Sequence, residues 1–199
     1  MASTAQLPPP HRRGEFIAHL EKLARQLNSD NQHVVSAARR TLAQLRRSVT
    51  GQRHEHDALA VVFEHQPPRD EENSWLLVAG LFALNARERK SPRLPLGRAL
   101  RELDSRRDGI TAQTRLRQLL AADEQTLPQH LRSTLRLLAD HGITVDFHSL
   151  LDNVIVLLNP EEDEENRRDV KWKWATDFHR QPSSSKKTNG GDDSQENDE

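Results

Sequence analysis

The sequence contains no cysteine and no tyrosine, and its 199 residues include only three tryptophans and five phenylalanines. The lack of cysteine excludes a disulfide scaffold and thiolate metal sites, and it fits a reducing compartment. The scarcity of aromatic residues argues against a platform that stacks bases on several rings. Any contact with nucleic acid is therefore expected to be made to the backbone.

Long apolar runs are also absent. No segment approaches the roughly 18 apolar residues of a membrane span, and residues 1–14 lack the apolar run of a signal peptide. We therefore expect a soluble, cytoplasmic protein with no membrane partner.

Strand signals are missing too. We find no convincing alternation of apolar and polar residues and no Asn-Gly hairpin between strand-like runs. The best strand candidate, "NVIVLLN" at residues 153–159, continues a helical pattern that Asp146 can cap. The sequence predicts an all-α protein of about eight or nine helices in two small packed helical lobes.

Composition divides the chain into four parts. Residues 1–13 are expected to form a disordered lead-in, and residues 181–199 a disordered acidic tail. An N-terminal helical lobe is predicted over residues 14–90 and a C-terminal helical lobe over residues 91–180. In the first lobe, "ENSWLLVAGLFAL" at 72–84 is apolar nearly all round, which is typical of a buried helix.

Several helix ends carry local signals. Helix starts are expected at the turn "NSDN" (residues 28–31) and at four capping residues: Ser74, Thr111, Thr126 and Asp146. Gly142 is expected just past the end of the helix that follows Thr126. In "VKWKWATDF" at 170–178, the two tryptophans point in nearly opposite directions on a helix, so one is expected in the core and one nearer the surface.

Charge is unevenly placed, although the formal net charge is only -1. Acid is concentrated in "PEEDEEN" at 160–166 and "GGDDSQENDE" at 190–199. Two stretches, residues 31–54 and 89–101, contain arginines and no acid at all. The surface is therefore expected to be polarised.

Arginines without acidic neighbours mark the helix predicted from residue 32 onward. Arg39 and Arg46 share one of its faces, and Arg40 and Arg47 lie about 100° away. The positions three and four residues away hold neutral residues, so intrahelical ion pairs are not available. Two interpretations stay open at this point: a solvated face with partners on another helix, or a face that binds anions such as phosphate. The apolar stripe of this helix is predicted to be Val34, Ala38, Leu42, Leu45 and Val49.

Later helices repeat the pattern of arginine beside a leucine stripe. The planar guanidinium suits phosphate because it donates two parallel hydrogen bonds. These further candidates are Arg98, Arg101, Arg115, Arg117, Arg132 and Arg136.

An enzyme is the weaker alternative. "HEHD" at 54–57 contains a His-Asp pair of the kind that helical metal phosphohydrolases use, and His33 with Asp104 or Asp108 could complete a ligand set. No other metal, phosphate-loop or nucleophile motif is present. A helical protein–protein adaptor with no nucleic-acid role is the other alternative.

Six segments follow one another in a characteristic order and spacing: "AQLRR" (43–47), "WLLVAGLFA" (75–83), "LGRAL" (96–100), "RLRQLLAAD" (115–123), "HLRSTLRLL" (130–138) and "VKWKWATDF" (170–178). Together they resemble the CasB family, the small subunit of the type I-E Cascade complex of CRISPR immunity. The resemblance covers about residues 14–180. Arg117 stands where the family usually has an aromatic residue, and Ala121 and Ser133 stand where some relatives have further arginines.

The resemblance implies an all-helical, non-enzymatic subunit without cofactor or metal. It implies other Cascade subunits, crRNA, target DNA and a second copy of the chain as partners, with a role in holding the R-loop in antiviral defence. Arg46 and Arg47 are expected to contact nucleic acid, and Arg98, Arg115 and Arg132 are expected to do so on weaker motif matches.

Overall fold

The computed structural model describes residues 9–49, 55–86, 92–106 and 110–180. These ranges contain nine α-helices and one pair of two-residue strands, so the prediction of an all-α fold is confirmed. The elements are α1 (Pro9–Gln26), α2 (Gln32–Ser48), α3 (Glu55–Phe63), α4 (Glu72–Asn85), β1 (Arg93–Leu94), α5 (Leu96–Arg106), α6 (Ile110–Ala121), α7 (Leu127–Asp140), β2 (Thr144–Val145), α8 (Phe147–Leu158) and α9 (Glu164–His179).

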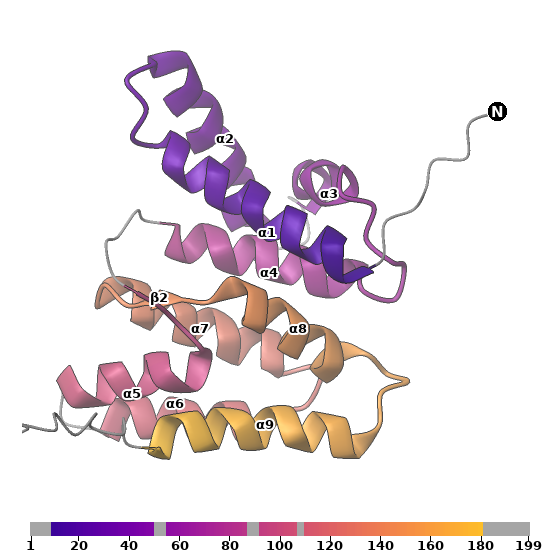
Figure 1. Cartoon of the computed structure of the whole chain (residues 1–199), viewed down its shortest axis with the longest axis vertical. Helices are drawn as coiled ribbons and strands as arrows, with labels where there is room; N and C mark the ends of the chain where they lie inside the picture. The colour runs from indigo at the N-terminus through magenta and orange to yellow at the C-terminus, as the bar shows by residue number, and fades with distance from the viewer. Residues whose placement is uncertain (1–8, 50–54, 87–91, 107–109, 181–199) are drawn as a thin grey trace, which may run out of the picture.

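The helices form layers (Figure 1). One side of α4 packs against α2 and α3, and the other side packs against α7 and α8. At the opposite end of the molecule, α9 packs against α5, α6 and α8. The arrangement places α2 and α9 at opposite ends of the stack.

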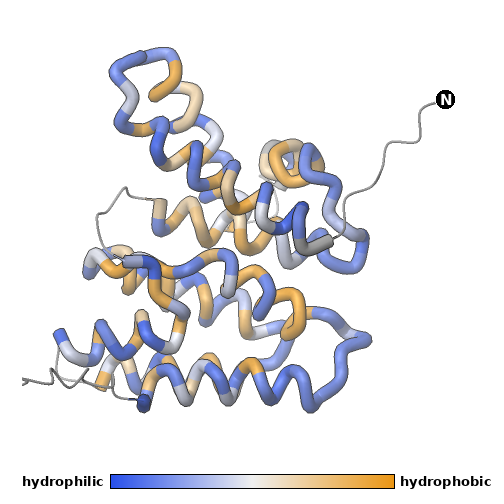
Figure 2. The backbone as a smooth tube through the Cα atoms, in the orientation of Figure 1, coloured by the Kyte–Doolittle hydropathy of each residue, from blue (hydrophilic) through white to orange (hydrophobic). Residues whose placement is uncertain are grey.

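The helix α4 is the apolar centre of the N-terminal half, as its sequence predicted. Ten of its residues are buried, among them Trp75, which is fully inaccessible. In Figure 2, α4 is mostly orange, whereas the helices above and below it alternate between blue and orange. An all-round apolar helix must be covered on every side, and α4 is.

The expected cap at Ser74 is wrong, because α4 begins earlier and Ser74 lies buried inside it. Glu71 occupies the N-cap position instead. Its buried carboxylate accepts hydrogen bonds from Arg13 Nη2 at 2.5 Å and from Trp75 Nε1 at 2.9 Å. These tertiary partners fix the start of the helix, and the local sequence does not show them.

The lead-in is shorter than expected, because α1 begins at Pro9 and not after residue 13. Arg13 is part of the fold: besides Glu71, it binds Asp152 of α8 at 3.0 Å. The hydrogen bonds that Arg13 donates to the Glu71 carboxylate raise the pKa of Arg13 above its ordinary value. Residues 1–8 and the predicted tail at 181–199 lie outside the described residues.

Two N-cap expectations are confirmed in atomic detail. Asn31 Oδ1 accepts from the backbone N–H of His33 at 2.9 Å, and Asp146 Oδ1 accepts from that of His148 at 3.0 Å. Thr126 holds the N-cap position of α7, but its hydroxyl donates to Asp123 Oδ1 at 2.6 Å and does not cap the helix.

Gly142 ends α7 as expected. Its φ of 76° is in the left-handed region, and its N–H donates to the carbonyl of Ala139 at 3.1 Å. The next N–H, of Ile143, donates to Leu138 at 2.9 Å, which completes a Schellman motif. Thr111 does not cap α6, because the helix begins one residue earlier, at Ile110.

The strand pair was not predicted. β1 and β2 pair in parallel, with Arg93 opposite Thr144 and Leu94 opposite Val145. Two residues are too few to show a period of two, so a pattern search cannot find them. The pair ties the segment before α5 to the segment before α8.

One continuous core joins the two predicted lobes. It includes Trp75 in α4 and Trp174 in α9, and the helices of the two halves meet where α4 packs on α7 and α8. The predicted boundary at residue 90 falls among the undescribed residues 87–91, so the two-lobe division stays a prediction. Within the described ranges, no helix combines the length and apolar character needed to cross a bilayer.

Candidate nucleic-acid interface

The first set of predicted arginines lies on α2 and is called here the α2 arginine face: Arg39, Arg40, Arg46 and Arg47. All four are exposed. The opposite face of the helix is buried, with Val35 in place of the expected Val34, which is only half-buried. The other members of the predicted apolar stripe are buried as expected.

Arg39 and Arg40 form no ion pair or hydrogen bond with the residues that the structure describes. The helix carries no acidic residue in its first turn, and residues 31–49 contain none at all. Two guanidinium groups therefore face solvent with their charge uncompensated by the neighbouring described side chains. This arrangement attracts anions.

Arg46 differs from Arg39 and Arg40. Its Nε and Nη2 donate to the carbonyl oxygen of Ala83 at 3.2 and 3.0 Å. Ala83 lies in the last turn of α4, where carbonyl groups lack partners within the helix. Arg46 thus holds α2 against the end of α4 while part of its side chain stays exposed.

A second set of arginines lies on α6 and α7. Arg115 Nη1 donates to Gln118 Oε1 at 3.0 Å and to Ser133 Oγ at 3.3 Å, and so it links the two helices. Arg117 and Arg136 are exposed and lack ion-pair partners in the described part of the chain.

Arg132 brings the second set close to α2. Its Nε is buried without a hydrogen-bond partner among the described atoms. It lines a groove of about 390 Å³ together with Val49 after α2, Leu76 of α4 and Pro128 of α7. The groove therefore connects the C-terminal end of α2 with the first turns of α7.

Arg98 and Arg101 lie apart from the α2 arginine face. They are on α5, which packs against α6 and α9, whereas α2 packs against α1, α3 and α4. Arg98 forms an ion pair with Asp177 of α9 at 3.4 Å, and Arg101 is half-buried with no ion pair to described residues. The ten predicted arginines thus form separate clusters.

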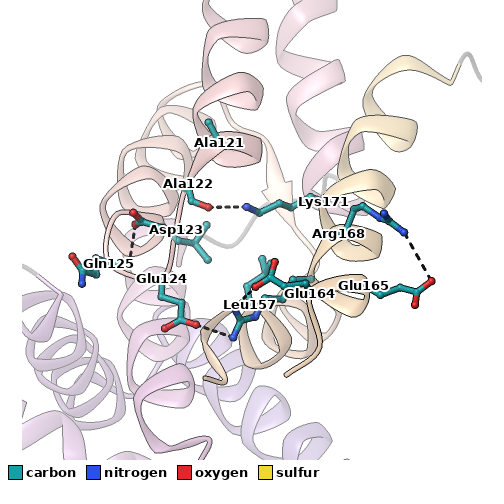
Figure 3. Close-up of a pocket in the computed structure, with 12 residues that line it drawn as sticks. Ala121, Ala122, Asp123, Glu124, Gln125, Leu157, Glu164, Glu165, Arg168 and Lys171 are labelled. Atoms are coloured by element: carbon teal, nitrogen blue, oxygen red, sulfur yellow. Dashed lines mark hydrogen bonds and ion pairs between the residues drawn. The ribbon is translucent and has the colours of Figure 1, made fainter. Parts of the chain in front are cut away.

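One hollow, which measures about 930 Å³, lies between the α6–α7 connection and the first turns of α9, and it is not an anion site (Figure 3). Its basic side chains already have partners within the chain. Arg167 forms an ion pair with Glu124 at 2.8 Å, and Lys171 Nζ donates to the carbonyl oxygen of Ala122 at 2.7 Å. Arg168 faces Glu165. The contacts of Arg167 and Lys171 fasten α9 to the α6–α7 connection.

The proposed ligands of a metal phosphohydrolase are not brought together among the described residues. His54 and Asp108 lie outside the described residues, as does the side chain of Asp57. His33 is exposed at the start of α2, and Asp104 belongs to α5. Across the described ranges, no three His, Cys, Asp or Glu side chains gather in a way that could hold a metal ion.

Sequence reasoning missed two cations near the end of α9, Lys173 and Arg180. It did anticipate the split between the tryptophans, since Trp174 is 1% exposed and Trp172 is 73% exposed. The sequence "VKWKW" contained a signal for Lys173. Consecutive residues on a helix lie 100° apart, so Lys173 lies between the directions of Trp172 and Trp174.

The family model that matches this chain and the solved structures that share its fold belong to the same family. The model of the family described as CRISPR-associated protein Cse2 matches residues 41–179. A search of curated protein sequences finds no match.

Several solved structures share the fold. CasB from Thermobifida fusca is 22% identical, with 83% of this chain and 98% of that chain covered, at a TM-score of 0.61. CasB from Thermus thermophilus is 25% identical, with 86% of this chain and 98% of that chain covered, at a TM-score of 0.60. A chain of a "CRISPR RNA-guided surveillance complex" is 19% identical, with 85% of this chain and 91% of that chain covered, at a TM-score of 0.61.

Proposed function

Since the chain belongs to the family of the CRISPR-associated protein Cse2, we propose that it is a non-catalytic small subunit of a type I-E Cascade complex. In this role it binds the backbones of crRNA, target DNA and displaced strand and stabilises the R-loop in antiviral defence. Its partners are the other Cascade subunits and a second copy of itself, in the cytoplasm. A structural neighbour named as an RNA-guided surveillance complex supports this role.

The observation that carries the proposal is the pair Arg39 and Arg40. Both are exposed on an acid-free helix and lack partners among the described residues. An ordinary solvated helix would place acids three or four residues away. Guanidinium groups held in this way are suited to phosphate oxygens, which they bind through two parallel hydrogen bonds.

The mechanism requires no reading of bases by this chain. Base pairing between guide and target supplies sequence specificity, and the protein supplies positive charge that positions the strands. The groove lined by Arg132 joins the C-terminal end of α2 to the first turns of α7, and we infer that a strand bound at the α2 arginine face continues past this end of the helix towards α7. Arg47, Arg117 and Arg136 add exposed charge along these helices.

The test is a salt titration of target-DNA binding by assembled complexes of verified subunit composition. Replacing Arg39 and Arg40 with glutamine removes two phosphate contacts. The plot of log affinity against log salt should then flatten by roughly 1.4 to 1.8, from about 0.7–0.9 per contact. Affinity should fall about equally for every guide sequence, because no base is read. Lysine at both positions should restore only part of the loss.

The matched control removes the same charge from arginines that already have carboxylate partners. Arg25 pairs with Glu21, and Arg106 pairs with Glu102 at 2.7 Å. The double glutamine variant of Arg25 and Arg106 should keep the wild-type slope. The proposal fails if the Arg39 and Arg40 variant and the wild type give parallel lines of equal affinity, which would leave a solvated face or a protein contact.

A further inference from the structure

The side chain of Trp172 has no place in the core or in the α2 arginine face. It is 73% exposed on the outer side of α9, whereas Trp174, two residues later, is buried. An exposed indole is costly in water and provides a flat π-face that a ligand can cover.

A hollow lies beside this ring. It measures about 440 Å³ and is lined by Trp172, Ala175, Thr176, His179 and Arg180. The last four residues lie one or two turns after Trp172 on the same side of α9. The surface that these residues expose to the hollow is almost entirely apolar. The charge around the ring therefore distinguishes nucleic acid from a protein partner, because the cores of protein interfaces are depleted in lysine.

Positive charge lies along one flank of the same helix turn. Lys173 lies about 100° round the helix from Trp172, on the side that faces α5, and it is exposed. Arg98 of α5 reaches this flank, because its Nε lies 3.4 Å from Asp177, and it remains 52% exposed. Arg180 follows at the end of the helix.

The acids of α9 offset this charge only in part, since Asp169 lies one turn before Lys173. Asp177 is already paired with Arg98. Glu165 and Asp169 lie on the turns before Trp172, and Glu165 faces Arg168 at 3.9 Å. The C-terminal half of α9 thus combines one exposed ring with cations on the side nearest α5.

We propose that this surface, made of Trp172, Lys173, Arg180 and Arg98, binds single-stranded nucleic acid. One base stacks on the indole of Trp172, and the neighbouring phosphates contact the three cations. Only an unpaired strand can present a base face in this way, because a duplex keeps its bases stacked. The proposal extends the proposed function to a second site, at the opposite end of the molecule from α2 (Figure 1).

The few aromatic residues of the chain exclude a platform of several rings, but a single exposed ring is sufficient for one base. Stacking of one base on an aromatic ring contributes about 1–3 kcal/mol, which corresponds to roughly 5- to 100-fold in affinity. Preference for sequence should be weak, since every base has a π-face.

The experiment measures binding of the purified full-length chain to a labelled 12-nucleotide oligothymidine and to a duplex of the same length. Trp172→Leu and Trp172→Ala should weaken single-strand binding by about 5- to 100-fold and leave duplex binding close to wild type. Trp172→Phe should retain most of the affinity. Because the side chain is exposed, all three variants should unfold at the wild-type temperature.

Fluorescence supplies an independent readout. The oligonucleotide should quench part of the tryptophan emission of the wild type and none of the emission of Trp172→Phe, since Trp75 and Trp174 are buried. Lys173→Gln should reduce the salt dependence by roughly 0.7, the value for one single-strand phosphate contact.

Three results would overturn the proposal: a wild-type chain that does not bind the oligonucleotide, a Trp172→Ala variant with unchanged affinity, or a Trp172→Leu variant as good as wild type. The last result would indicate an apolar protein contact. None of them affects the salt titration of Arg39 and Arg40 in the assembled complex, so failure here is distinguishable from failure of the proposed function.

Discussion

The guanidinium of Arg46 donates two hydrogen bonds to a single carbonyl oxygen in the last turn of α4. That end of the helix carries partial negative charge, so a cation there is stabilising. The resemblance assigned Arg46 to nucleic acid, and that assignment stays a prediction. The structure adds a packing role, which the acid-free sequence around Arg46 could not show because Ala83 is 37 residues away.

We expect Arg46→Ala to lower the free energy of unfolding by about 1 kcal/mol, since charge-assisted hydrogen bonds at a helix end contribute on this scale. Urea unfolding followed by circular dichroism measures it. Arg39→Ala removes the same charge from the same helix without breaking a described contact and should leave stability unchanged. Equal stability of the two variants would show that the bonds to Ala83 contribute nothing.

His65 packs against residues of α1. Its ring lies edge-on to Phe16 and to His19, at centroid distances of 5.5 and 5.0 Å, and its Nε2 is buried without a partner. Burial, followed by the charge of His19, lowers the pKa of His65 below its ordinary value of about 6.5, although Glu64 and Glu15 oppose the shift.

A depressed histidine pKa means that protonation favours the unfolded chain. The contribution of His65 to stability is therefore complete above about pH 6.5 and is lost as pH falls from there towards the folded pKa. We expect His65→Gln to reduce the fall in the urea midpoint between pH 7.5 and pH 5.5. His33→Gln, on the exposed start of α2, is the control. If both variants keep the full wild-type pH dependence, the account of His65 is wrong.

Among the elements, α5 and α9 make a notably close contact at Gly97. A Cβ atom at this position would lie 2.3 Å from the carbonyl oxygen of Trp174 and 2.7 Å from Cβ of Asp177. The backbone of α9 cannot move aside without disturbing the buried Trp174 ring. The glycine in "LGRAL" therefore sets the distance between the two helices.

We expect Gly97→Ala to lower the free energy of unfolding by about 1–3 kcal/mol, which is typical of overpacking. Gly14→Ala is the matched control, because Gly14 lies in α1 with no atom within 4 Å of an added Cβ. That change should be neutral or slightly stabilising, since alanine favours helix. Thermal unfolding of both variants tests this, and a stable Gly97→Ala would show that the helices have room to separate.

The contrast between local and distant signals explains which elements could be predicted. The caps at Asn31 and Asp146 and the glycine at Gly142 depend on residues within five positions, and the sequence predicted them correctly. The start of α4 depends on the contact of Glu71 with Arg13, 58 residues away, and it was missed. Periodicity and capping are local, whereas partners across helices require the folded backbone.

At the scale of the whole molecule, the predicted polarity of the surface is the feature that links the fold to the proposed function. The α2 arginine face lies at one end of the helix layers, and the acidic first turn of α9, with Glu164 and Glu165, lies at the other. The presence of arginine on α2, α5, α6 and α7 could be predicted from the sequence pattern. Its division into clusters, with Arg98 on α5 remote from α2, could not, because it follows from which helices pack together.

The most direct test of the central claim is the composition of the particle that forms around this chain. A tagged chain should be produced with the other proteins and the guide array of its own CRISPR system and purified at moderate salt. We expect it to retain the other Cascade subunits and one RNA species of defined length, and to bind DNA that matches the guide. A chain that purifies without RNA, or a particle that binds matching DNA equally well without this chain, would contradict the account.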